Sequence, residues 1–232
     1  MTNTQHIYQN DAERYHALVS REDHEGNLLP AILNIDPFVG KDVIELGSGT
    51  GRLTRLIAPF VDTLIISDLS RHMLSHAVSQ LKEMNLDHWY ACLESHNALP
   101  FAPRSADIII AGWSFCYAAI YVGDKWKALL ENTLAQVYNI LRPDGKLILI
   151  ESLGTGVETP QAPDVLKDYL GYLDQHGFSS TWIRTDYCFN DLGEAIHLTR
   201  FFFGDAPMPM YQTDAGVIVP ECTGLWWRDK VG

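Results

Sequence analysis

The sequence predicts an α/β fold in which mostly parallel strands form one doubly wound sheet with helices on both faces. Short apolar runs alternate with longer helical segments between about residues 40 and 151. Two of these runs, 64–66 and 108–110, are continuously apolar, as expected of strands that are covered on both faces. The chain has 232 residues, of which 47% are hydrophobic, and this is sufficient for one full core.

The elements of the first two thirds follow from capping and turn residues. Asn27 is expected to cap an early helix and Ser70 a later one, and Pro59 ends the helix between them. The segment 142–145, Arg-Pro-Asp-Gly, is a turn in which Pro fixes φ and Gly accepts a positive φ. The expected helices are 11–19, 28–35, 53–58, 70–84 and 125–141, and the expected strands are 42–46, 63–67, 89–93, 107–111 and 146–151.

The last third departs from strict alternation. A helix over 162–176 precedes a strand over 181–189, a helix over 191–203 and a final strand within 217–227. Since one helix separates these two late strands, they can pair antiparallel at an edge of the sheet. The three phenylalanines 201–203 cannot share one helix face, so some are expected to line a pocket or a dimer contact.

Composition excludes several classes of partner. The net charge of -12, from 17 basic and 29 acidic residues, disfavours nucleic acid and anionic membrane surfaces. The N-terminus lacks the apolar core of a signal peptide, and the longest apolar stretch, 108–123, is too short and interrupted to span a bilayer. The four cysteines form no C-x-x-C pair and are expected as free thiols. A cytoplasmic protein without a membrane partner is therefore expected.

No metal site is expected. His72 and His76 have the i, i+4 spacing of a helical metal pair, but no third ligand accompanies them.

A glycine-rich loop follows the first expected strand. Ligands of open α/β sheets bind at the carboxyl ends of the strands. Gly47, Gly49 and Gly51 allow a sharp turn and the close approach of a ligand, and the helix that follows offers free N–H groups. The loop therefore predicts a cofactor cradle.

Two cofactor classes compete for this loop. A dinucleotide fingerprint, G-x-G-x-x-G, requires glycine where this chain has Arg52. Glu45, two residues before the loop, would repel a pyrophosphate but attract the ammonium group of S-adenosylmethionine. Asp68, at the end of the second strand, suits the two hydroxyls of a ribose. The charge pattern favours the sulfonium cofactor.

Several motifs, in order between about residues 40 and 151, carry a resemblance. They are Val-Ile-Glu-Leu-Gly-Ser-Gly-Thr-Gly at 43–51, Asp-Leu-Ser-Arg-His-Met-Leu at 68–74, Asn-Ala-Leu-Pro-Phe at 97–101 with Asp-Ile-Ile-Ile-Ala at 107–111, and Leu-Arg-Pro-Asp-Gly-Lys-Leu at 141–147. Together they resemble the class I S-adenosylmethionine-dependent methyltransferases of the UbiE-like group (methyltransferase type 11). The resemblance implies a Rossmann-like, seven-stranded sheet in the order 3-2-1-4-5-7-6 with the last strand antiparallel.

The resemblance also implies a cofactor site. The first motif would bind the methionine end, and Asp68 would bind the ribose. The second and third motifs would contact the adenine, and a carbonyl at the end of the fourth strand would accept from the amino group. At Asn97 many members have Asp, but an amide can still accept from the adenine amino group. The implied cofactor residues are Glu45, Gly47, Ser48, Gly49, Asp68, Leu69, Met73, Asn97, Ala98, Ala111 and Gly112.

The acceptor is expected to be a small molecule. The tetrads of adenine methylation and the Pro-Cys pair of cytosine methylation are absent, whereas aromatics gather after the fourth strand and in the N-terminal segment. Glu151 either orients the acceptor or is a solvated strand end. The candidate acceptor residues are Tyr15, His24, Trp113, Tyr117 and Tyr121, of which all but Trp113 are possible bases.

One domain is expected, with an N-terminal helical cap (1–39), a cofactor core (40–152) and a C-terminal part (153–232) that completes the sheet and the acceptor pocket, in a monomer or homodimer. Two other functions stay open: a non-catalytic S-adenosylmethionine-binding module and a nicotinamide-dependent oxidoreductase.

Overall fold

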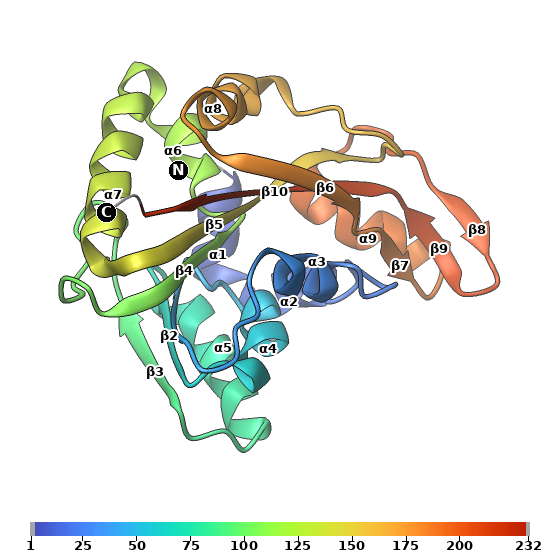
Figure 1. The fold of residues 1–232 in the computed structure, drawn as a ribbon. Helices are drawn as coiled ribbons and strands as arrows, with labels where there is room; N and C mark the ends of the chain where they lie inside the picture. The colour runs from blue at the N-terminus through green and yellow to red at the C-terminus, as the bar shows by residue number, and fades with distance from the viewer. Residues whose placement is uncertain (1–2, 231–232) are drawn as a thin grey trace.

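A seven-stranded sheet forms the centre of the computed structural model, which describes residues 3–230 (Figure 1). The strand order is β3-β2-β1-β4-β5-β10-β6. All neighbours pair in parallel except β10, which is antiparallel to both β5 and β6. The strands are β1 (Asp42–Leu46), β2 (Thr63–Asp68), β3 (Trp89–Leu93), β4 (Ala106–Gly112), β5 (Leu141–Thr155), β6 (Ser179–Arg184) and β10 (Glu221–Asp229).

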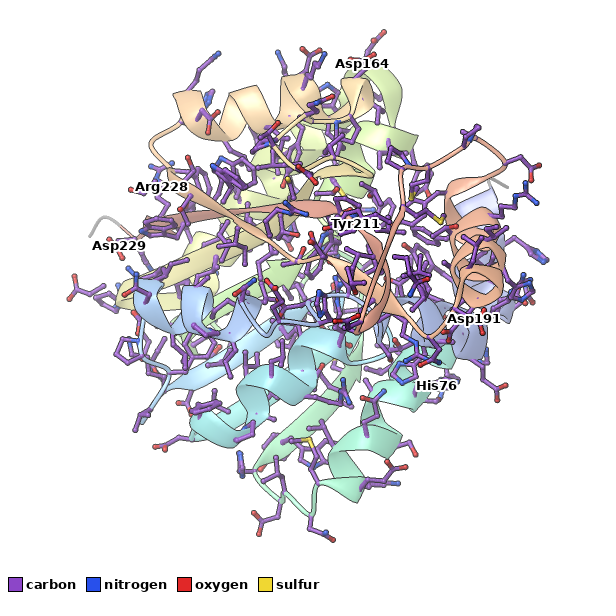
Figure 2. The ribbon with its side chains drawn as sticks, turned by 90° about the vertical axis from the view of Figure 1, so that its right-hand side faces the viewer. His76, Asp164, Asp191, Tyr211, Arg228 and Asp229 are labelled. Atoms are coloured by element: carbon purple, nitrogen blue, oxygen red, sulfur yellow. The ribbon has the colours of Figure 1, made fainter. Side chains whose placement is uncertain are left out.

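Helices cover both faces of this sheet, and each face has its own core. On one face, α7 (Trp126–Ile140) and α8 (Asp164–Gln175) pack against residues such as Ile109 and Leu149. On the other, α3 (Leu28–Ile35), α4 (Arg52–Ile57) and α5 (Arg71–Glu83) pack against Ile108, Ile148 and their neighbours. Figure 2 places Asp164 of α8 and His76 of α5 on opposite sides of the sheet. The doubly wound fold and the strand order are confirmed.

A second, three-stranded sheet was not expected. It has the order β7-β9-β8, with β7 (Tyr187–Phe189), β8 (Tyr211–Thr213) and β9 (Gly216–Val219), and it lies at the right of Figure 1 beside α9 (Leu192–Phe203). The expected single strands 181–189 and 217–227 are each divided between the two sheets. The chain changes sheet at Thr185-Asp186 and at Pro220, where the missing N–H of proline interrupts a ladder.

Several local expectations need correction. The polar N-terminal segment forms a helix, α1 (Asn3–Asn10), before α2 (Ala12–Val19), and a short helix α6 (Cys116–Tyr121) follows β4. Asp23, not Asn27, caps α3, because its carboxylate accepts from the backbone N–H groups of Asn27 and Leu28. Short 3-10 turns, η1 (Ala58–Phe60) and η2 (Gly123–Lys125), follow α4 and α6.

The turn before the main part of β5 uses its residues differently from the prediction. Asp144 has the positive φ of 63°, and Gly145 does not. Gly145 is needed for space instead, since a Cβ there would lie 2.9 Å from the carbonyl oxygen of Arg142 and 3.0 Å from that of Asp107.

No helix in the described part of the chain combines the length and apolarity that crossing a membrane requires.

Candidate functional site

The glycine loop joins β1 to α4 in a conformation that requires glycine. Gly47, Gly49 and Gly51 have φ values of 72°, 55° and 90°. A Cβ on Gly47 would lie 2.5 Å from the Cβ of Ser114, and one on Gly51 would lie 3.0 Å from Ala77 of α5. Thus the loop is held between α5 and the segment after β4.

Asp68, at the end of β2, ties the loop to the next one. Its two carboxylate oxygens accept from the backbone N–H groups of Gly49, at 2.8 Å, and of Ser70, at 2.7 Å. Burial raises the pKa of Asp68 and these two hydrogen bonds oppose the rise. Each oxygen has a further lone pair for a ligand hydroxyl. The expected cap of Ser70 on α5 is present, because its Oγ accepts from the N–H of Met73.

Glu45 lies beneath the loop and is almost completely buried. Its Oε2 accepts from the Thr54 hydroxyl at 2.6 Å, and burial raises its pKa to about 8. Ser48, three residues further along the chain, is also buried. Its N–H donates to the carbonyl of Ser67 on β2. Burial disfavours the ionised form of the Glu45 carboxyl, and a cationic ligand group placed beside it would favour that form. Glu45 is therefore suited to binding such a group.

The loop after β3 brings different residues to the cradle from those expected. Asn97 and Ala98 are exposed. In contrast, the ring of His96 lies 3.6 Å from the position of a Cβ on Gly47, and Glu94 accepts from the Ser67 hydroxyl at 3.1 Å. Burial lowers the pKa of His96 to about 4 and raises that of Glu94 to about 7. The sequence motif begins at Asn97, one residue after His96 and three after Glu94, and so did not indicate them.

The other expected cofactor residues occupy varied environments. Leu69 is 76% exposed after β2, whereas Met73 is buried in the first turn of α5. Ala111 and Gly112 end β4 and pair with Leu149 and Ile150 of β5. Of these expected residues, Met73 is thus a core side chain, and Leu69 is open to solvent.

Aromatic side chains from three helices meet above the glycine loop. Tyr15 of α2 lies 3.9 Å from the position of a Cβ on Gly49. Tyr8 of α1 contacts Tyr15 edge to face and shares a hydroxyl–hydroxyl hydrogen bond with Tyr117 of α6. Tyr121 stacks on Tyr117 with ring centroids 5.3 Å apart. The structure thus brings Tyr15, Tyr117 and Tyr121 together.

The N-terminal helices are also bonded to the cradle by polar contacts. The backbone carbonyl of Tyr8 accepts from the Ser70 hydroxyl at 2.8 Å. The ring of His16 lies 3.2 Å from the Thr50 hydroxyl, and Gln80 of α5 donates to the Thr50 carbonyl at 2.6 Å. His24, by contrast, is exposed on the loop after α2, beside Asp186, and does not join the aromatic group.

Trp113 and Arg52 contact one another beside the glycine loop, which Arg52 follows directly. Trp113 has a φ of 51°, a strained value for a bulky residue, and its backbone N–H donates to the carbonyl of Ile150 at 2.7 Å. The Arg52 guanidinium lies 3.5 Å from the centroid of its indole and is paired with buried Glu22. Arg52 was predicted only as the residue that breaks the dinucleotide fingerprint, and Glu22 was not predicted, because no local pattern links these positions.

Glu151 is not a solvated strand end. It is fully buried, accepts from the N–H of Cys116 at 3.1 Å and the hydroxyl of Tyr169 at 2.9 Å, and so holds the start of α6. The solvated-end interpretation is therefore wrong.

The cradle fits the donor and acceptor groups of S-adenosylmethionine. Three buried atoms around it, Ser48 Oγ, Glu94 Oε2 and His96 Nε2, have no hydrogen-bond partner within the described residues. Such atoms are costly unless a ligand or water pairs with them. The positive-φ glycines, the Asp68 carboxylate and these atoms together suit a polar nucleoside with a cationic tail.

Comparison with known proteins agrees with this fit. A methyltransferase domain model matches residues 43–145. The chain is 24% identical over 225 residues to the Saccharomyces cerevisiae protein named "Probable S-adenosylmethionine-dependent methyltransferase CRG1", covering 91% of this chain and 72% of that protein. It is 25% identical over 162 residues to malonyl-[acyl-carrier protein] O-methyltransferase 1 of Coxiella burnetii, covering 68% of this chain and 46% of that one.

The fold is also found in solved structures. A methyltransferase from Aquifex aeolicus superposes with a TM-score of 0.57 at 12% identity, covering 100% of both chains. The matched domain spans β1 to the turn of β5, and therefore contains the glycine loop, Asp68 and the segment after β3. Residues 43–145 therefore form a methyltransferase domain, and the chain is similar to proteins named as S-adenosylmethionine-dependent methyltransferases, with S-adenosylmethionine as methyl donor and cofactor.

Proposed function

We propose that this protein transfers the methyl group of S-adenosylmethionine to a small-molecule acceptor in the space between the glycine loop and the N-terminal helices. The main observation in support is the Asp68 carboxylate, which accepts hydrogen bonds from the loop after β1 and from the loop after β2. The aromatic group above Gly49 supports an acceptor that is small and partly apolar.

In this proposal residues 1–39 form a helical cap, 40–152 the cofactor core and 153–232 the part that completes the sheet and the acceptor pocket. Glu45 and the backbone of 47–49 hold the methionine end, with Ser48, Ala111 and Gly112 beside it. Asp68 holds the ribose, and Leu69, Met73, Asn97 and Ala98 surround the adenine. We add His96, whose ring lies 3.6 Å from the position of a Cβ on Gly47, and Glu94, which accepts from the Ser67 hydroxyl.

Methyl transfer from a sulfonium is an in-line displacement with a good leaving group, so positioning supplies much of the acceleration. The cap contacts to Ser70 and Thr50 would exclude water and hold Tyr15 over the loop. The Coxiella relative is named for an O-methylation. We infer from this and from the polar Arg52 side that an oxygen or nitrogen acceptor suits the space better than a hydrocarbon alone.

Calorimetric titration with S-adenosylmethionine, S-adenosylhomocysteine and NADH tests the proposal. We expect the two sulfur ligands to bind and NADH not to bind. Absence of binding at millimolar ligand would exclude the function, and preferential binding of NADH would favour an oxidoreductase. A binding module without turnover predicts binding but no demethylated product with any acceptor.

Asp68 variants test the ribose contact. We expect Asp68→Ala to weaken S-adenosylhomocysteine binding by about 100-fold, as the loss of hydrogen bonds to a charged group predicts. Asp68→Asn retains an oxygen that can accept from one loop N–H. It therefore distinguishes the effect of the side chain on the loop conformation from its effect on ribose binding. Wild type should discriminate against a 2′,3′-dideoxy analogue, and Asp68→Asn should lose most of that discrimination. Unchanged affinity in Asp68→Ala, with Asp62→Ala as an exposed control, would remove the assignment.

A further inference from the structure

Glu221 is a buried carboxyl that neither the motifs nor the cofactor cradle explains. It is 2% exposed and begins β10. Its Oε1 accepts from the Ser152 hydroxyl at 2.6 Å, while its Oε2 has no hydrogen-bond partner within residues 3–230. A buried carboxylate oxygen without a partner is expensive unless a ligand or water binds it.

The backbone fixes the direction of this side chain. The Glu221 N–H donates to Asp186 Oδ1 at 3.0 Å, and its carbonyl accepts from the Thr185 N–H at 3.0 Å. The pairing of β10 with β5 is irregular between Glu221 and Thr223. Such bulges redirect a side chain and are frequent beside active sites. Glu221 is therefore firmly placed at the point where the chain passes from the small sheet into the large one.

The surroundings of Glu221 connect it to the aromatic group above the glycine loop. Burial raises the pKa of Glu221, and the positive charge of Arg52 opposes this rise. Burial lowers the pKa of Arg52, and the phenols of Tyr187 and Tyr15 oppose that change. Tyr15 lies against Gly49, and Arg52 lies over Trp113. Arg52 is also paired with Glu22, which accepts from the Thr185 hydroxyl at 3.4 Å, while the Thr185 N–H donates to the Glu221 carbonyl. Arg52 and Thr185 thus connect the cradle to Glu221.

The tyrosines of this space are poor proton acceptors. Burial raises the pKa of Tyr15 and raises that of Tyr8 and Tyr117 well above the ordinary value, so all three remain protonated. His24 is remote from the group. A carboxylate is a better proton acceptor than these three buried phenols.

We propose that Glu221 is a catalytic residue whose free Oε2 accepts the proton of an O–H or N–H acceptor during methyl transfer. This rests on the function proposed above. A lone pair of the acceptor oxygen or nitrogen forms the new bond to the methyl carbon. The methyl–sulfur bond breaks with its electron pair going to sulfur, which becomes a neutral thioether. The acceptor proton passes to the Glu221 carboxylate, which becomes a carboxylic acid and later releases the proton to solvent.

The charged, titratable and hydroxyl groups that influence Glu221 come from several elements. They are Arg52 on α4, Asp186 before β7, Tyr187 on β7, and the hydroxyls of Ser152 and Thr155 on β5. Burial is the largest influence and raises the pKa of the Glu221 carboxyl. Since a base must be ionised, activity is expected to fall as pH decreases through a value above the ordinary ~4.3 of a glutamate.

The experiment measures S-adenosylhomocysteine release with a panel of model acceptors. The panel contains phenols, alcohols, carboxylic acids and amines, with thiophenol as a sulfur acceptor and 1-methylindole, which has no N–H, as a carbon acceptor. Wild type is compared with Glu221→Gln, with Glu221→Asp, and with Glu131→Gln on the exposed side of α7 as the control. Calorimetry with S-adenosylhomocysteine on every variant verifies that the cradle is intact.

We expect turnover of at least one O–H or N–H acceptor. Glu221→Gln should lower kcat by about 100-fold or more with little change in KM, and should abolish the acidic limb of the pH profile. Glu221→Asp should restore part of kcat together with the limb, which a purely structural role does not predict.

Three outcomes would overturn the assignment while cofactor binding stays intact. They are a Glu221→Gln variant that keeps kcat and the acidic limb, turnover restricted to thiophenol or 1-methylindole, and no turnover of any O–H or N–H member. If Glu221→Gln did not fold, Glu221→Asp would have to shift the acidic limb, and an unshifted limb would overturn the proposal. Loss of cofactor binding by wild type would instead refute the proposed function itself.

Discussion

Glu45 connects burial to ligand binding at the scale of one side chain. Its carboxyl is nearly inaccessible, and one hydroxyl, that of Thr54, is its hydrogen-bond donor. Burial outweighs this bond and raises its pKa to about 8, so the free protein holds the proton at neutral pH. An ammonium group placed beside it would favour the ionised form.

We therefore expect ligand binding to release a proton from Glu45. At pH 7, S-adenosylhomocysteine should release up to about one proton per site, and its affinity should increase with pH up to about 8. Calorimetry in two buffers of different ionisation enthalpy measures this release. Glu45→Gln should bind more weakly, by about tenfold or more, and release no proton. Tight binding by wild type without proton release would show that the carboxyl does not meet the ammonium group.

At the scale of elements, Gly51 sets the distance between α4 and α5. It is the N-cap of α4 with a φ of 90°, and a Cβ would lie 3.0 Å from both Cα and Cβ of Ala77. Gly26 has a similar φ of 74° but nothing within 4 Å of its Cβ position. The two glycines share a backbone requirement and differ in the space around them.

Alanine at these two positions separates strain from close packing. Gly26→Ala should destabilise the fold by ~1–2 kcal/mol through backbone strain alone. Gly51→Ala should cost clearly more, because α5 must also move, and it should impair S-adenosylhomocysteine binding. Thermal denaturation and calorimetry measure both effects. Equal destabilisation by the two variants would mean that α5 yields without cost.

Across the whole molecule, buried carboxyls gather at the carboxyl ends of the parallel strands. Glu45, Glu94 and Glu151 follow or end β1, β3 and the central part of β5, and burial raises their pKa values to about 8, 7 and 7. Their folded-state pKa values lie above the ordinary value, so they favour folding at low pH. This stabilisation is lost as pH rises through the folded-state values.

Free protein should accordingly lose stability between about pH 5 and pH 8, by roughly 2 kcal/mol or more in the free energy of unfolding. Denaturant titration across this range measures the slope. The combined variant Glu45→Gln, Glu94→Gln, Glu151→Gln should flatten it, with the exposed Glu83→Gln as the control. A wild-type protein that gains stability over this interval would contradict the raised pKa values.

The cofactor half was predictable because its signals are local. The glycine loop, Asp68 and the Ser70 cap lie within short segments whose residue types dictate turns and caps, and the structure has those elements within a residue or two of the predicted bounds. The strand order followed from the resemblance rather than from periodicity.

The acceptor side was not predictable in the same way. Glu22, Arg52 and Glu221 are brought together by strand pairing and helix packing across most of the chain. The small sheet divides two segments that read as single strands, because an apolar run does not reveal which sheet it joins. Asn97 and His96 are two alternating positions of one loop, and only the backbone path decides which of them faces Gly47.

The position of β10 has a consequence for the order of folding. This strand inserts between β5 and β6, both of which precede it in the chain, and its pairing with β5 closes a long loop. Contacts of such large sequence separation form late and slowly, whereas β1 to β4 are joined by local crossovers. During synthesis the ribosome delivers residues 42–112 well before 221–229. The cradle can thus assemble first, and a ligand present in the cell can stabilise a partly folded chain before Glu221 arrives to complete it.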